Sequence, residues 1–122
     1  MSPSLIRCLL AVLALSDAYE KIFSKDVARL LGVKRPTVHR SLTVLQEKNL
    51  ITKELYGDVH LTDAGRAPAQ ELETRRDDLT IHLTDAFGLS PEESVKAATV
   101  LMSELTPESL DKIAGKNLSK EG

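Results

Sequence analysis

The sequence predicts a mostly α-helical protein with one short hairpin, and three observations lead to this prediction. Apolar residues recur at helical spacing along most of the 122 residues. The triplets Ser-Pro-Glu at residues 90–92 and Thr-Pro-Glu at residues 106–108 are typical helix starts. Two β-prone runs, residues 50–55 and 59–61, flank a turn that contains Gly57, and such a pair is typical of a hairpin.

Residues 4–16 are the first predicted helix. The helix is apolar nearly all round, so we expect it to be buried between its neighbours. Residues 17–23 read as a polar connection. Residues 24–31 predict a short helix with Ser24 as its N-cap and Asp26 in the first turn, where a negative charge suits the helix dipole.

Residues 32–48 predict a turn followed by a helix with one apolar side. Gly32 and the basic pair Lys34 and Arg35 open the segment, and Pro36 is preorganised for a first helical turn. Apolar residues then fall at i, i+4 and i+7, at Val38, Leu42 and Leu45. A short helix, a glycine-containing turn and a second helix form the helix-turn-helix pattern, whose second helix enters the DNA major groove.

The hairpin follows directly after this second helix, which we expect to stop near Asn49. A hairpin in this place is the wing of a winged helix-turn-helix domain, with its turn at residues 56–58. Lys53 and His60 are the basic candidates for contact with the phosphate backbone, whereas Asp58 would repel phosphate. The wing is therefore expected to make only weak DNA contacts.

Helices are predicted for most of the remaining chain. Thr62 is expected to cap a long helix from Asp63 to about residue 86, with Pro68 favouring a kink near its start and Gly88 ending it. Its apolar stripe consists of Leu72, Leu79, Leu83 and Phe87. Two more helices are expected after Ser90 and Thr106, the second ending near residue 114. Residues 115–122 are polar and expected to be a disordered tail.

Composition and charge fit a cytoplasmic nucleic-acid-binding protein. The apolar fraction of 42% is that of a soluble globular chain, and no apolar run is long enough to span a membrane. The single cysteine, Cys8, excludes an intrachain disulfide. Residues 1–61 carry nine basic and six acidic residues, whereas residues 62–122 carry seven and twelve. This asymmetry suggests a DNA-binding N-terminal half and a separate C-terminal half.

The expected DNA contacts are polar and basic side chains of the helix-turn-helix and the wing. Arg40 is expected to reach guanine or a phosphate, and Pro36 and Thr37 a thymine methyl group. Ser24 and Lys25, at a helix N-terminus, suit phosphate. The full set is Ser24, Lys25, Lys34, Arg35, Pro36, Thr37, His39, Arg40, Thr43 and Lys53. The alternative is an ordinary solvated helix face.

Several blocks of the sequence match a known family in order. They are SKDVARLLGVKRPTVHRSLTVLQEKNLI, then LTDAGR, then LTDAFGLSPEE and ELTPESLDKI. Together they resemble the iron- and manganese-dependent repressors of bacteria and archaea (the DtxR/MntR family), in the short form without an SH3-like domain. The resemblance implies a winged helix-turn-helix DNA-binding domain over residues 1–66 and a helical dimerisation domain over residues 67–114. A homodimer of this kind would read a palindromic operator.

The resemblance also implies a divalent metal, iron or manganese, but the expected ligands are missing. Carried over without gaps, the family's ligand positions fall on Arg7, Leu10, Arg76, Thr99, Met102 and Ser103. None of these is a carboxylate or an imidazole, the donors that Mn²⁺ and Fe²⁺ prefer. We therefore predict no cofactor at the usual site. Arg7 and Arg76 are instead expected to pair with Glu104, Asp77 or Asp78.

A relocated metal site is one alternative. Asp78 and His82 share a helix face at i and i+4, and with Cys8 or Glu104 they would offer softer ligands. The plainer reading is a solvated Asp–His pair and a buried structural cysteine, although Cys8 as a thiol sensor stays open.

The resulting prediction is a homodimeric, sequence-specific regulator of transcription, most simply a repressor. The sequence contains no Ser/His/Asp arrangement and no glycine-rich phosphate loop, so it does not predict an enzyme. Besides the metal-responsive alternative, a dimeric winged helix that binds proteins and not DNA is a second alternative.

Overall fold

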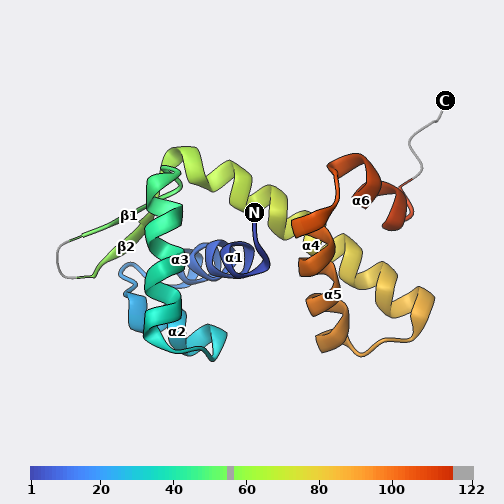
Figure 1. Ribbon diagram of the computed structural model, residues 1–122, viewed down its shortest axis with the longest axis horizontal. Helices are drawn as coiled ribbons and strands as arrows, with labels where there is room; N and C mark the ends of the chain where they lie inside the picture. The colour runs from blue at the N-terminus through green and yellow to red at the C-terminus, as the bar shows by residue number, and fades with distance from the viewer. Residues whose placement is uncertain (55–56, 117–122) are drawn as a thin grey trace. The chain divides into compact units, whose positions relative to one another are not determined.

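The computed structural model describes residues 1–54 and 57–116. In these residues the order of elements is α1 (Pro3–Ala18), α2 (Ser24–Leu31), α3 (Arg35–Glu47), β1 (Ile51–Lys53), β2 (Val59–Leu61), α4 (Asp63–Phe87), α5 (Pro91–Glu104) and α6 (Pro107–Ile113) (Figure 1). The fold is a mostly helical winged helix-turn-helix, as the sequence predicts. No helix among the described residues has both the length and the apolar character needed to cross a membrane.

The chain divides into two compact units, an N-terminal unit of residues 3–72 and a C-terminal unit of residues 73–122. The division falls inside α4, and the predicted domain boundary at residue 66 lies earlier in the same helix. The physical reason is that Ala69 and Leu72, on the first half of α4, pack on the core of the N-terminal unit.

The N-terminal core is formed by the apolar sides of α1, α2 and α3 together with the hairpin. The predicted stripe of α3 is confirmed, because Val38, Leu42 and Leu45 are at most 1% exposed. The apolar helix α1 is buried as expected through a run of core residues. These α1 residues are Ile6, Cys8, Leu9, Leu10, Ala11, Val12 and Leu13.

The wing is an antiparallel pair in which Ile51 lies opposite Leu61 and Lys53 opposite Val59. The preceding connection is not simply polar, contrary to the prediction for residues 17–23. Ile22 is 2% exposed, and its carbonyl accepts a 2.8 Å hydrogen bond from the Val59 amide. Phe23 forms an isolated antiparallel bridge with Asp58, so this connection extends the hairpin by backbone pairing. Tyr56 of the predicted turn lies outside the described residues.

The cap of α2 differs from the prediction. Phe23, not Ser24, is the N-cap residue, and the Asp26 carboxylate accepts a 2.8 Å hydrogen bond from the Phe23 amide. Because Ser24 is already helical, its side chain cannot fold back over the first turn, and its buried hydroxyl has no hydrogen-bond partner among the described residues. The prediction failed because Asp26, three residues after Phe23, satisfies the free amide in place of a serine cap.

The motif Leu-Thr-Asp-Ala-Gly connects the wing, the end of α3 and the start of α4. The Thr62 hydroxyl donates to the Asn49 carbonyl at 2.7 Å and accepts from the Gly65 amide at 2.9 Å, which confirms the predicted cap. The Thr62 amide donates to the Leu50 carbonyl at 3.1 Å. Gly65 packs so closely on Leu50 that a side chain would overlap it. The motif therefore fixes where α4 begins relative to the wing and the end of α3.

The C-terminal unit contains the second half of α4 with α5 and α6. Leu79 and Leu83 are buried as predicted, but Phe87 is 69% exposed and is not part of a core within this chain. The predicted caps are confirmed, since Ser90 and Thr106 accept hydrogen bonds from the Glu93 and Ser109 amides. Helix α4 continues through Pro68 without interruption.

The start of the predicted disordered tail is held in place. The Lys116 amide donates to the Asp111 carbonyl at 2.8 Å, and the Lys116 ammonium pairs with Asp78. The rest of the predicted tail, residues 117–122, lies outside the described residues.

Candidate nucleic-acid interface

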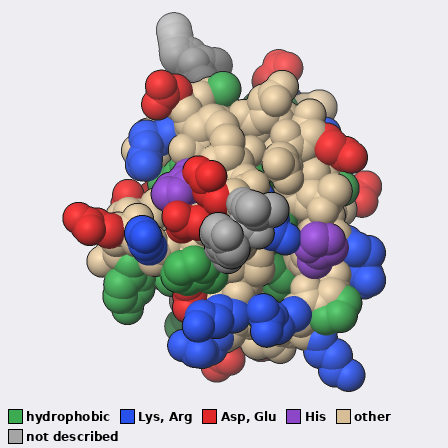
Figure 2. All heavy atoms as spheres, turned by 90° about the vertical axis from the view of Figure 1, so that its left-hand side faces the viewer, with side chains coloured by type: hydrophobic (Ala, Val, Ile, Leu, Met, Phe, Trp, Pro, Cys, Tyr) green, Lys and Arg blue, Asp and Glu red, His purple; other side chains and the backbone are tan. Residues whose placement is uncertain are grey.

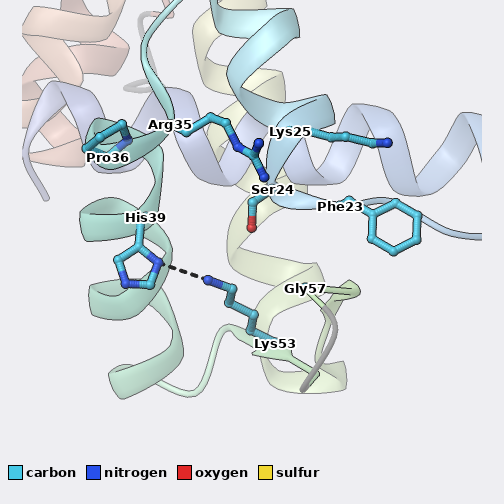
Figure 3. A pocket seen from close by; sticks show the side chains of 8 residues that line it. All are labelled: Phe23, Ser24, Lys25, Arg35, Pro36, His39, Lys53 and Gly57. Atoms are coloured by element: carbon cyan, nitrogen blue, oxygen red, sulfur yellow. Dashed lines mark hydrogen bonds between the residues drawn. The ribbon is translucent and has the colours of Figure 1, made fainter.

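A hollow in the N-terminal unit brings the start of α2, the start of α3 and the wing together (Figure 3). Its volume is about 790 Å³, and most of its lining residues were expected DNA contacts. The lining residues are Phe23, Ser24, Lys25, Arg35, Pro36, His39, Lys53 and Gly57. Three segments that are separate in the sequence therefore supply one concave surface with three cationic side chains.

Local sequence explains how each cation reaches this surface. Arg35 is the first residue of α3 and Pro36 the second, so the helix begins at the hollow with the positive end of its dipole there. Lys25 lies in the first turn of α2 and is exposed, with its ammonium 5.8 Å from the centre of the Phe23 ring. Lys53 ends β1. Figure 2, which views the molecule from the left-hand side of Figure 1, shows Lys and Arg side chains gathered along one edge of this face.

The remaining expected contacts lie along α3 outside the hollow. Lys34 is the exposed N-cap of α3, and Arg40 is exposed nearly two helical turns further on. Thr37 is half-buried, and Thr43 is exposed with its hydroxyl donating to the His39 carbonyl at 2.9 Å. The methyl group of Thr43 and the guanidinium of Arg40 are thus accessible to a ligand in front of α3.

One contact at this surface has no signal in the sequence. The Lys53 Nζ atom lies 2.9 Å from the His39 Nδ1 atom and connects the wing to α3. His39 and Lys53 were both expected DNA contacts, but neither spacing nor composition indicated that they meet. Phe23 and Gly57 also line the hollow and were not predicted; the backbone bridge of Phe23 to Asp58 brings that segment to the wing.

The positions implied for a metal do not fit Mn²⁺ or Fe²⁺. Leu10 and Met102 are buried apolar side chains, at 6% and 8% exposure. The hydroxyl of Thr99 donates to the Val95 carbonyl of its own helix. The Arg76 guanidinium binds the Asp77 carboxylate at 3.0 Å, which is one of the ion pairs expected for it. None of these side chains supplies the anionic oxygen or imidazole nitrogen that such a metal needs.

The relocated candidates are not gathered either. Among residues 1–54 and 57–116, no three His, Cys, Asp or Glu side chains are grouped so that they could hold a metal ion. Asp78 and His82 do line a shallow depression of the C-terminal unit, but Lys116 occupies the Asp78 carboxylate. Cys8 belongs to the core of the N-terminal unit.

Cys8 gives a prediction for the pH dependence of stability. The side chain is 1% exposed, and burial raises the pKa of its thiol to about 12. The folded chain then keeps a proton that the unfolded chain loses above about pH 9. This contribution to stability is complete below that pH and is lost as the pH rises towards 12.

We expect the free energy of unfolding to fall more steeply between about pH 9 and 11 in the wild type than in Cys8→Ala. Urea titrations of both proteins at several pH values measure the two slopes. Equal slopes would show that the thiol does not titrate differently in the folded state.

Comparisons with known proteins place the N-terminal unit in a described family model. Residues 3–58 match the MarR family model. This match covers α1, α2, α3 and the start of the wing, which are the elements around the hollow. A search of curated protein sequences gave no match.

Solved structures resemble the chain over nearly its whole length. The manganese regulator SloR superposes with a TM-score of 0.78 at 25% identity, covering 96% of this chain and 56% of SloR. The metal-dependent transcriptional regulator MtsR superposes with a TM-score of 0.75 at 23% identity, covering 96% of this chain and 56% of MtsR. IdeR of T. acidophilum superposes with a TM-score of 0.70 at 21% identity, covering 91% of this chain and 52% of IdeR. The chain thus spans about half the length of these three proteins and has the winged-helix fold of transcriptional regulators.

Proposed function

We propose that the chain is a sequence-specific regulator of transcription, a repressor in the simplest case, that binds duplex DNA through α2, α3 and the wing. The observation that supports this most strongly is the hollow itself. Cationic side chains from three segments surround the N-terminus of α3, where the helix dipole and the positive charge both favour phosphate.

In this proposal the residues divide into two groups. Lys25, Lys34, Arg35 and Lys53 hold the phosphate backbone and set the register of the protein on the duplex, whereas the hydroxyl of Ser24 is buried. Base edges are read by α3 in the major groove, where Arg40 donates to guanine and Pro36, Thr37 and Thr43 contact thymine methyl groups. His39 stands between the two groups, on α3 at the edge facing the wing.

We propose further that two chains act together through their C-terminal units. Several large apolar side chains of α4 and α5 are exposed in the single chain: Ile81, Phe87, Val95 and Val100. A partner chain would remove this surface from water. A symmetric dimer carries two copies of α3 and reads a palindromic operator with half-sites about one helical turn apart. We also propose that the protein acts in the cytoplasm.

A metal-responsive repressor is the second candidate, and the similarity to SloR and MtsR favours it. The side chains at the implied ligand positions argue against a metal-responsive repressor, because they include no carboxylate and no imidazole. We therefore propose that operator binding needs no Mn²⁺ or Fe²⁺.

The test is a selection of bound fragments from genomic duplex DNA, repeated with a chelator and with added Mn²⁺, Fe²⁺ or Zn²⁺. We expect the same fragments with and without chelator. Lys34→Ala and Arg40→Ala should each weaken retention roughly tenfold or more, whereas Lys96→Ala, an exposed cation of α5, should not. Fragments recovered only with a metal would favour the second candidate. Equal recovery with Lys34→Ala, Arg40→Ala and the wild type would favour a protein-interaction module instead.

A further inference from the structure

The contact between Lys53 of the wing and His39 of α3 determines which ring nitrogen of His39 carries a hydrogen. The two residues are 14 positions apart in the sequence and face each other across the hollow, with Lys53 Nζ 2.9 Å from His39 Nδ1 (Figure 3). A lysine ammonium has three donors and no acceptor. The His39 Nδ1 atom must therefore be the acceptor, which means that it carries no hydrogen.

The position of the ring hydrogen then follows. A neutral imidazole carries one hydrogen, and if Nδ1 accepts, that hydrogen is on Nε2. A doubly protonated ring would point an N–H group at the ammonium, so the contact exists only with neutral His39. The other cations of the hollow do not make this contact, since Lys25 lies over the Phe23 ring and Arg35 starts α3.

We propose that Lys53 is a positioning residue that fixes His39 as a hydrogen-bond donor, through Nε2, at the DNA surface. This inference rests on the proposed function. In the major groove, guanine, adenine and thymine each offer an acceptor, whereas cytosine offers only its amino donor. In this tautomer, the Nε2–H group of His39 can donate to guanine, adenine or thymine at the base that it faces. Cytosine is disfavoured there because it offers no acceptor. Lys53 thereby affects base preference without touching a base.

The first test uses the free protein and needs no DNA. Long-range proton–nitrogen NMR spectra distinguish the two neutral tautomers of an imidazole, in a buffer alkaline enough to keep the ring neutral. We expect His39 to be in the Nε2–H form only. Lys53→Arg keeps a donor and should keep this spectrum, whereas Lys53→Met should give a mixture of tautomers. An Nδ1–H form in the wild type, or an unchanged spectrum in Lys53→Met, would overturn the inference.

The second test compares base preferences after selection from randomised duplexes. Lys53→Met should admit cytosine at one position of each half-site, reducing a preference of roughly tenfold towards none. Lys25→Met removes the same charge from the same hollow without touching His39, so it should weaken binding to all sequences equally. If Lys53→Met selects the same bases as the wild type, the inference fails while DNA binding stands. If the wild type retains no duplex, the proposed function fails and the inference fails with it.

Discussion

Replacing Gly65 with alanine is expected to destabilise the chain by about 3 kcal/mol or more, because the new methyl group has no room. A Cβ atom at this position would lie 1.9 Å from the Leu50 carbonyl oxygen and 2.7 Å from the carbonyl carbon. These are backbone atoms, so no rotation of a side chain relieves the overlap. The Leu50 carbonyl also accepts the Thr62 amide, and this hydrogen bond would be displaced with it.

Helix propensity alone predicts the opposite result, a more stable Gly65→Ala protein. Gly65 lies in the first turn of α4, and alanine in a helix is normally more favourable than glycine by about 0.5–1 kcal/mol. Ala64→Gly, at the exposed neighbouring position, measures the propensity term alone and should cost at most about 1 kcal/mol. Thermal or urea unfolding of both variants checks the prediction. A Gly65→Ala protein as stable as the wild type would mean that α4 does not start against Leu50.

Removing two cations from the hollow is expected to have the largest effect on DNA binding. Lys25→Ala combined with Arg35→Ala should weaken binding to every duplex sequence, because both side chains are proposed to neutralise phosphates. The slope of log K against log salt should become shallower by about two, one for each lost contact. At physiological salt we expect a loss of roughly a hundredfold, since each lost phosphate contact is taken to weaken binding about tenfold.

The matched control removes two exposed cations from the C-terminal unit. Lys96→Ala combined with Lys112→Ala changes the net charge by the same amount on α5 and α6. This control should leave the salt slope close to that of the wild type. Fluorescence anisotropy with a labelled DNA fragment across a salt series measures the salt slopes of both double variants. The same slope in the two double variants would mean that charge acts through the whole molecule and not through the hollow.

Much of the fold could be predicted from the sequence, because its signals are local. The stripe of Val38, Leu42 and Leu45 and the caps at Thr62, Ser90 and Thr106 each depend on residues within a turn or two of one another. Such patterns are readable without knowing the tertiary structure.

The features that were missed depend on contacts between distant segments. Ile22 is buried because its backbone pairs with Val59, and nothing in the polar run around it indicates that. The need for glycine at residue 65 arises from Leu50, which lies in another element. Phe87 follows the apolar spacing of α4 yet is exposed, since spacing alone does not say whether a side chain faces its own chain or a partner.

The candidate site was predictable as a set of residues but not as an arrangement. Positive charge and polarity on the helix-turn-helix indicated Lys25, Arg35 and His39, whereas the contact between His39 and Lys53 needed the structure. Base reading depends on such arrangements, because a hydrogen-bond donor is specific only when its direction and tautomer are fixed.

The most direct measurement of the central claim is hydroxyl-radical footprinting of a fragment recovered from genomic DNA. We predict two protected stretches related by inverted symmetry, with centres about one helical turn or a whole multiple of it apart. We also predict that both stretches are lost together in the Lys25→Ala, Arg35→Ala variant, while the Lys96→Ala, Lys112→Ala control keeps them. Protection that survives the loss of Lys25 and Arg35, or no protection at protein concentrations that retain the fragment, would contradict the claim that α2, α3 and the wing bind duplex DNA.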